Sequence, residues 1–120
     1  MEKLRGAARL GLGTVQFGLA YGVTNAAGKV NPTEAAAMVD TAIESGIRLI
    51  DTAALYGESE AVLGGIERRG ELDIVTKTVK VADATSDAEA ADRIEAGFER
   101  SLAMLGVNGV YGLMLHSADD

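Results

Sequence analysis

The sequence predicts an α/β fold built on a parallel sheet. Short runs of β-branched and aliphatic residues alternate with helical patterns along the 120 residues, and this alternation is the signature of βαβ units. The predicted order is β-α-β-α-β-α-β, and right-handed crossovers place the helices on one side of the sheet. Four such strands make half of a closed barrel. Open doubly wound sheets share the alternation, so periodicity alone leaves both folds open.

The first part of the chain predicts a strand, a long loop and a helix. The strand covers residues 9–15, and a glycine-bearing loop follows over residues 18–30. Asn31 is expected to cap the helix, with Pro32 at its first position and Gly46 as its C-terminal stop. One side of this helix is apolar, with Ala35, Met38, Val39, Ala42 and Ile43 at helical spacing.

The middle of the chain continues the alternation. A second strand over residues 47–50 ends at Asp51, and a helix is expected from Ser59 to about Gly70. A third strand over residues 73–76 ends at Lys77. Both strands therefore finish on a titratable residue.

The last part of the chain predicts one more helix and strand. Ser86 and Glu89 match the S-x-x-E capping box, which satisfies backbone donors at a helix start. A fourth strand over residues 110–115 ends at His116. The helix is expected to end near Gly106, with an inward stripe of Ala91, Ile94, Phe98, Leu102 and Leu105.

Four reactive side chains are expected at one edge of this sheet. Asp51, Lys77 and His116 end three successive strands, and Tyr56 follows the first of them. Taken singly, each has an ordinary structural explanation: a capped turn, a packing aromatic, a solvated strand end or a structural imidazole. Taken together, they suit carbonyl reduction, in which a tyrosine can donate a proton if a neighbouring cation stabilises its phenolate. Asp51 would hold Lys77, and His116 would orient the carbonyl.

Composition excludes several classes of function. The chain has 18 acidic and 11 basic residues, for a net charge of −7, which argues against nucleic-acid binding. The adjacent pair Arg68-Arg69 is better explained as a helix-end cation. With no cysteine and one histidine, no metal site is predicted. No apolar run suits a signal peptide or a membrane span, so we expect a cytoplasmic protein without membrane partners.

Seven short motifs together resemble the aldo-keto reductase family in their order and spacing. They are Leu12-Gly13-Thr14, Ile50-Asp51-Thr52-Ala53, Tyr56-Gly57, Ser59-Glu60, Leu63-Gly64, Thr76-Lys77 and Leu115-His116. The resemblance implies a TIM-type parallel (β/α) barrel. Residues 1–120 would be the N-terminal part of a single (β/α)8 domain, its first four β/α units.

The resemblance also implies roles for particular residues. Tyr56 matches the proton donor, Lys77 and Asp51 its supporting pair, and His116 the residue that orients a small carbonyl or alcohol substrate. Gly13 and Thr14, with Asp51, match the place where the backbone meets the nicotinamide of NADP(H), or less often NAD(H). The loop that carries Phe17, Tyr21 and Val23 would lie near the substrate entrance.

Nucleotide binding is expected without a Rossmann loop. Gly11 and Gly13 begin a G-x-G-x-x-G pattern, but Gln16 stands where the third glycine is required. A closed barrel typically has about 250 residues, and in the family the later loops supply most of the contacts to the cofactor. Two alternatives to an enzyme remain: a non-catalytic cofactor-binding or partner subunit, and a structural half-barrel. If the chain ends at residue 120, we expect self-association through the open strand edges.

Overall fold

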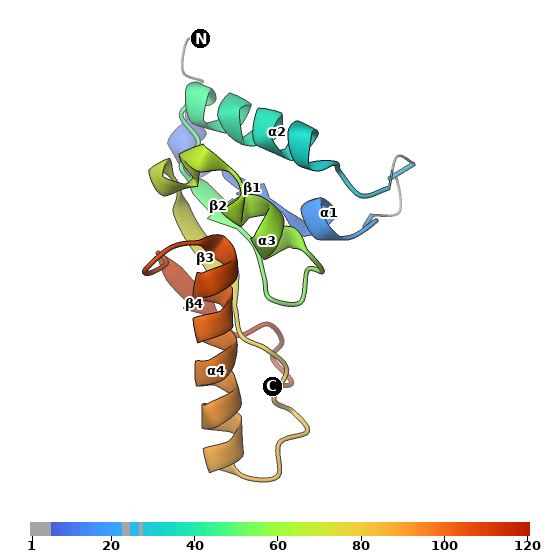
Figure 1. Ribbon diagram of the computed structural model, residues 1–120, viewed down its shortest axis with the longest axis vertical. Helices are drawn as coiled ribbons and strands as arrows, with labels where there is room; N and C mark the ends of the chain where they lie inside the picture. The colour runs from blue at the N-terminus through green and yellow to red at the C-terminus, as the bar shows by residue number, and fades with distance from the viewer. Residues whose placement is uncertain (1–5, 23–24, 27) are drawn as a thin grey trace.

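The computed structural model describes residues 6–22, 25–26 and 28–120 of the chain. In this part of the chain, one sheet contains the strands β1 (Gly11–Gly13), β2 (Leu49–Asp51), β3 (Asp73–Lys77) and β4 (Gly112–Met114). The spatial order is β1-β2-β3-β4, and each neighbouring pair is parallel (Figure 1). The predicted α/β class with four parallel strands is confirmed.

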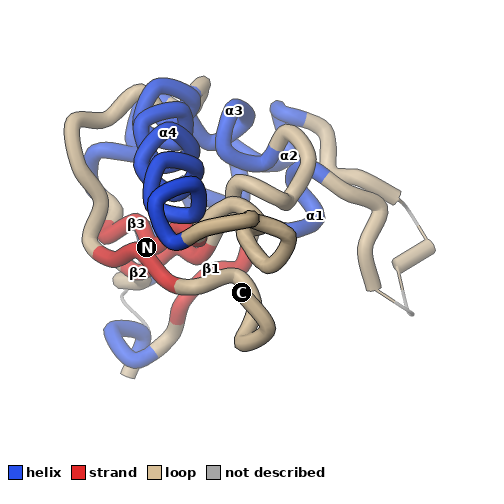
Figure 2. Tube along the Cα trace, turned by 90° about the horizontal axis from the view of Figure 1, so that it is seen from below, coloured by secondary structure: helices blue, strands red, loops and turns tan. Residues whose placement is uncertain are grey.

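The α-helices lie together on one side of the sheet, as Figure 2 shows. This placement agrees with right-handed crossovers between successive parallel strands. The helical segments are η1 (Ala7–Arg9), α1 (Val15–Gly18), α2 (Pro32–Ser45), α3 (Ser59–Gly64), η2 (Glu67–Glu71) and α4 (Asp87–Leu105).

The two long helices begin and end where their local signals predict. The Asn31 side chain accepts a hydrogen bond from Glu34 N at 2.9 Å, and Ser86 accepts one from Glu89 N at 3.1 Å. Gly46 and Gly106 follow α2 and α4 with φ angles of 95° and 64°. These left-handed angles favour glycine, and they end the helices there.

The two faces of the sheet have different surroundings. Leu12, Ile50 and Ile74 are paired in register and point toward the helices. They pack with a core that includes Phe17, Ala35, Val39, Ile43, Leu63, Ile66 and Leu105. Successive residues of a strand point to opposite faces, so Gly13 and Asp51 lie on the face away from the helices.

Several boundaries differ from the sequence prediction. Strands β1, β2 and β4 are shorter than expected, whereas β3 has its predicted extent. The short helix α1 begins at Val15, the predicted end of the first strand, and ends at Gly18, the predicted start of the loop. The helix predicted up to Gly70 divides into α3 and η2, because Ile66 between them has an extended backbone. Phe17, predicted in a loop, lies in α1 and is 2% exposed in the core. Val23 lies outside the described residues.

The buried side of α4 also differs from the predicted apolar stripe. Its buried residues are Gly97, Ser101 and Leu105, whereas Ile94 and Phe98 are half-buried. A Cβ added at Gly97 would lie 2.6 Å from Cγ1 of Val79. The helix thus approaches the rest of the protein through small residues, which a search for large apolar residues does not detect.

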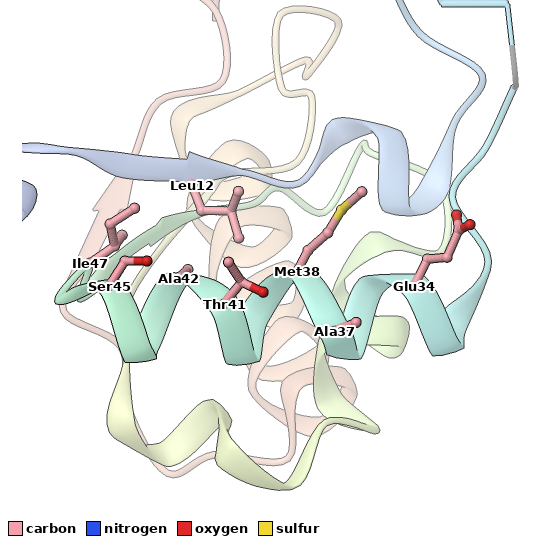
Figure 3. Close-up of a pocket in the computed structure, with 8 residues that line it drawn as sticks. All are labelled: Leu12, Glu34, Ala37, Met38, Thr41, Ala42, Ser45 and Ile47. Atoms are coloured by element: carbon pink, nitrogen blue, oxygen red, sulfur yellow. The ribbon is translucent and has the colours of Figure 1, made fainter. Parts of the chain in front are cut away.

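Both edges of the sheet carry exposed apolar side chains. Tyr111 is 73% exposed beside β4, and Leu113 and Leu115 are also exposed. At the other edge, Leu12 points from β1 toward α2, and an apolar groove runs along that helix (Figure 3). Within the described residues, no helix is long and apolar enough to span a membrane.

Candidate active site

An ion pair between Lys77 and Asp51 forms the centre of the site. Lys77 Nζ lies 2.9 Å from Oδ1 and 2.8 Å from Oδ2 of Asp51, and 2.9 Å from the carbonyl oxygen of Thr52. An ammonium has three hydrogens to donate, so these three oxygens engage all of them. The Lys77 side chain is 12% exposed and the Asp51 side chain is 40% exposed, so the ammonium is largely shielded from solvent.

The sheet register explains why these two residues meet. Asp51 is paired with Val75 across the β2–β3 ladder, and Lys77 lies two residues farther along β3. Side chains two residues apart on a strand share a face. The lysine therefore extends from the same face as the aspartate, at the carboxyl ends of both strands.

The Tyr56 ring contacts both Lys77 and His116. Lys77 Nζ is 4.8 Å from the centre of the tyrosine ring, a cation–π contact. The His116 ring lies 5.8 Å from the tyrosine ring, centre to centre, at an interplanar angle of 72°, which is an edge-to-face arrangement. The structure thus brings together all four side chains that the sequence placed at this edge.

The strand-end placement of the two residues predicts that the Tyr56 oxygen and the Lys77 nitrogen lie within hydrogen-bond reach or one bridging water of each other. Among the described residues, no direct hydrogen bond joins them. The ammonium instead faces the ring of the tyrosine, since its three hydrogens already point to Asp51 and Thr52. The phenolic oxygen is therefore available to an incoming group.

His116 is positioned by its backbone. Its N–H donates to Thr78 Oγ1 at 3.2 Å, and Thr78 N donates to the Met114 carbonyl at 2.9 Å. These bonds extend the pairing of β3 with β4 beyond the last paired residues. The imidazole Nδ1 is buried without a partner in the described part of the chain.

The loop that carries Tyr56 is held by its backbone and by two glycines. Tyr56 N donates to the Ala53 carbonyl at 3.1 Å, and Ser59 N donates to the Tyr56 carbonyl at 3.0 Å. Gly57 has a φ of 56°, and a Cβ on it would lie 2.5 Å from the Gly18 carbonyl oxygen. The end of α1 therefore packs directly against this loop, and the approach requires glycine.

Gly13 and Thr14 differ in what they present at the mouth of the sheet. Gly13 is paired with Asp51, and a Cβ built on it would meet nothing within 4 Å. Thr14 is fully buried, and its N and Oγ1 donate to the Asp51 carbonyl at 3.0 and 2.9 Å. Gly13 therefore leaves its backbone uncovered beside Asp51, while Thr14 fixes the turn from inside.

Comparison with known proteins identifies the family of the chain. Residues 9–120 match the model of the aldo/keto reductase family. The chain belongs to this family. It is 37% identical over 93 residues to an aldo-keto reductase of Mycolicibacterium vanbaalenii, and 34% identical to one of Mycolicibacterium smegmatis. In each case the match covers 74% of this chain and 31% of the relative, so the chain spans about a third of the length of these curated relatives.

Solved structures lead to the same family. The fold superposes on that of a Pseudomonas aeruginosa protein assigned to the aldo-keto reductases, with a TM-score of 0.74 and 35% identity. A second such structure from that organism gives a TM-score of 0.71 and 34% identity. The matches cover 90% of this chain but 42% and 40% of those chains. The four parallel strands thus correspond to part of an aldo-keto reductase barrel.

Sequence reasoning missed the buried polar residues behind the candidate site. Ser59 and Glu60 entered it only as a motif, and Thr76 only as the neighbour of Lys77. All three are buried. Ser59 donates a hydrogen bond to the Thr14 carbonyl, and Thr76 donates one to Glu60. A sequence signal was present at Thr76. Its neighbour Lys77 points away from the helices, so Thr76 points into the helix layer, where a polar group needs a hydrogen-bond partner.

Proposed function

We propose that this chain carries the proton-transfer part of an NAD(P)H-dependent site that reduces aldehydes or ketones to alcohols. The observation that carries the proposal is the contact of the Tyr56 ring with both the Lys77 ammonium and the His116 ring, with Lys77 fixed by Asp51. In this proposal Tyr56 is the proton donor and His116 orients the carbonyl. We expect the protein to act in the cytoplasm.

The arrangement suits donation of a proton to a carbonyl oxygen. As hydride adds to the carbonyl carbon, the oxygen gains negative charge and takes the phenolic proton of Tyr56. The phenolate left behind lies beside the Lys77 ammonium, and an adjacent opposite charge favours an ionised group. His116 borders the same ring and can donate a hydrogen bond to the substrate oxygen.

A nicotinamide cofactor supplies the hydride when it is bound. Of the described residues, Gly13 and Asp51 are the ones suited to hold its reactive ring, because the Gly13 backbone is uncovered next to the Asp51 side chain. Thr14 supports them through its bonds to the Asp51 carbonyl. We expect NADP(H) rather than NAD(H), as the family resemblance implies.

A chimera tests the proposal. Residues 9–120 replace the matching segment of the Pseudomonas aeruginosa relative, and NADPH consumption is followed with a reactive aldehyde. Tyr56→Phe should lower kcat by about 10²–10⁴-fold, the usual contribution of a positioned general acid. Cofactor affinity should barely change, because the phenol does not hold the dinucleotide.

Tyr111→Phe is the matched control, since it removes a phenolic hydroxyl from an exposed tyrosine outside the site. A folded chimera that binds NADPH but turns over no carbonyl would favour the non-catalytic subunit. Full turnover by the Tyr56→Phe variant would remove Tyr56 from the mechanism.

A further inference from the structure

Six buried polar side chains form two hydrogen-bonded clusters behind the Asp51–Lys77 pair. Each cluster contains one residue from the first turn of α3, namely Ser59 or Glu60. Neither cluster contains Tyr56, Lys77 or His116. The members are Thr14, Thr52 and Ser59 in the first cluster, and Glu60, Thr76 and Ser101 in the second.

The Ser59 cluster is attached to the strand end that carries Asp51. Ser59 Oγ lies 2.7 Å from Thr14 Oγ1 and 3.1 Å from Thr52 Oγ1, and 2.8 Å from the Thr14 carbonyl oxygen. One consistent set of protons runs from Thr52 to Ser59, from Ser59 to Thr14, and from Thr14 to the Asp51 carbonyl. The backbone that directly follows the Asp51 side chain is therefore tied to α3.

The Glu60 cluster is attached to the strand that carries Lys77. Glu60 Oε2 accepts from Thr76 Oγ1 at 2.8 Å, and Oε1 accepts from Ser101 Oγ on α4 at 3.0 Å. Thr76 immediately precedes Lys77 in β3. Glu60 thus links the first turn of α3 to the backbone that aims the lysine.

These links meet directly behind the tyrosine. Ser59 N donates to the Tyr56 carbonyl at 3.0 Å, so the loop that holds the phenol is continuous with the first turn of α3. The same turn reaches the neighbours of Asp51 and Lys77 through side chains. One rigid unit therefore sets the position of Tyr56 relative to both charged residues.

We propose that Ser59 and Glu60 are positioning residues, which hold the Tyr56 ring against Lys77 and His116. Stability alone does not explain them. Glu60 is 6% exposed, and the partners that its oxygens have in the described chain are hydroxyls, although burying a carboxylate without a cation is unfavourable. What the two residues provide is a fixed geometry, because hydrogen bonds with defined donors lock rotamers as apolar packing does not.

The lone histidine of the chain is a built-in reporter of this geometry. The His116 ring lies edge-to-face with Tyr56, so its proton resonances feel the ring current of the tyrosine. The experiment records the His116 ring resonances of the 120-residue chain by NMR at about pH 9, where an ordinary imidazole is neutral. Tyr56→Leu removes the aromatic ring and defines the full change in chemical shift.

Ser59→Ala and Thr76→Val should each move the His116 resonances toward the Tyr56→Leu position. Thr76→Val keeps the shape of the side chain while removing the hydroxyl that Glu60 accepts, so it tests the second cluster even if Ser59→Ala fails to fold. Ser45→Ala is the control: it removes another buried serine hydroxyl, on α2, and should leave the reporter unchanged. Urea unfolding of every variant measures the loss of stability separately.

A purely structural role predicts lower stability in Ser59→Ala and Thr76→Val with unmoved His116 resonances, and that result would overturn the proposal. The catalytic meaning of the positioning rests on the proposed function, but the NMR reading does not. If the reporter moves while the chimera shows no turnover, the proposed function fails and the positioning role stands.

Discussion

Replacing Gly18 by alanine should displace the Tyr56 loop and thereby test how closely the site depends on its support. Gly18 ends α1, and its Cα faces the backbone of the loop. An added Cβ would lie 2.6 Å from Ser59 N and 2.8 Å from Glu58 N, and it would come closer still to the Tyr56 carbonyl oxygen. These are backbone atoms, so no side chain can rotate away to relieve the contact.

The size of the effect follows from these distances. An ordinary Cβ contact begins near 3.4 Å, so the loop must withdraw by at least 0.8 Å from its position at Ser59 N. Overpacking of this kind typically destabilises a protein by about 1–3 kcal/mol. A displacement of about 1 Å at a catalytic group can lower the rate by about 10²-fold. The stability loss should therefore accompany a disproportionate loss of turnover in the chimera.

Urea unfolding gives the stability, and the His116 resonances and the chimera's kcat report on the site. Gly109→Ala is the matched control, because a Cβ there meets nothing within 4 Å and the φ angle is not positive. That control should be neutral or more stable by about 0.4–1 kcal/mol. Unchanged stability, His116 resonances and kcat in Gly18→Ala would refute the reasoning from close backbone approach.

Three further outcomes are expected. The 120-residue chain should form dimers or larger species, which light scattering would detect. The reason is that both sheet edges are uncovered: one carries Tyr111 and Leu113, and the other borders the α2 groove. A monomer at all protein concentrations would contradict this. The chain alone should consume NADPH with a reactive aldehyde far more slowly than about 1 s⁻¹. The family resemblance places most cofactor contacts in loops that follow the fourth strand of the barrel. Turnover at about 1 s⁻¹ would disprove this expectation. The Thr85 hydroxyl and amide, followed by Arg93, lower the pKa of Glu89 from 4.5 to about 2. The stabilisation from this carboxylate should therefore be complete above pH 4.5 and disappear as the pH falls toward 2. The measurement compares the free energy of unfolding of the unmodified chain with that of Glu89→Gln across this pH range. A difference that does not shrink toward pH 2 would contradict the expectation.

Local signals predicted the helices and the composition of the site. The caps at Asn31 and Ser86 were correct because a side-chain acceptor at a helix start is set by residues three positions apart. The convergence of the four candidate residues was predicted because the ends of parallel strands share one edge, a rule of topology rather than of contact. Arg69, interpreted as a cation at the end of its own predicted helix, bonds the carbonyls of Leu105 and Gly106 at the end of another helix, α4, and the local pattern did not predict this contact.

The remaining features depend on distances that no local pattern encodes. Only one of the two hydrogen bonds of the predicted capping box forms as expected. In the other, the Glu89 carboxylate accepts from Thr85 N, one residue before the predicted donor Ser86. The Lys77 ammonium lies over the Tyr56 ring because the Thr52 carbonyl takes its third hydrogen. Helix α4 approaches through Gly97 because Val79 occupies the space beside it. Each outcome is decided by residues distant in sequence or by backbone atoms that carry no sequence signal.

The buried hydroxyls suggest how a sequence reading of such sites could be extended. Strand residues alternate between faces, so the neighbour of a site residue on a strand must point into the helix layer. An apolar neighbour, such as Ile50 before Asp51, joins the core and carries no further information. A polar neighbour such as Thr76 requires a buried partner, and the first turn of the helix after the preceding strand is the nearest element that can provide one. Glu60 supplies that partner here, so a threonine beside a strand-end lysine indicates where the supporting residues of the site are to be found.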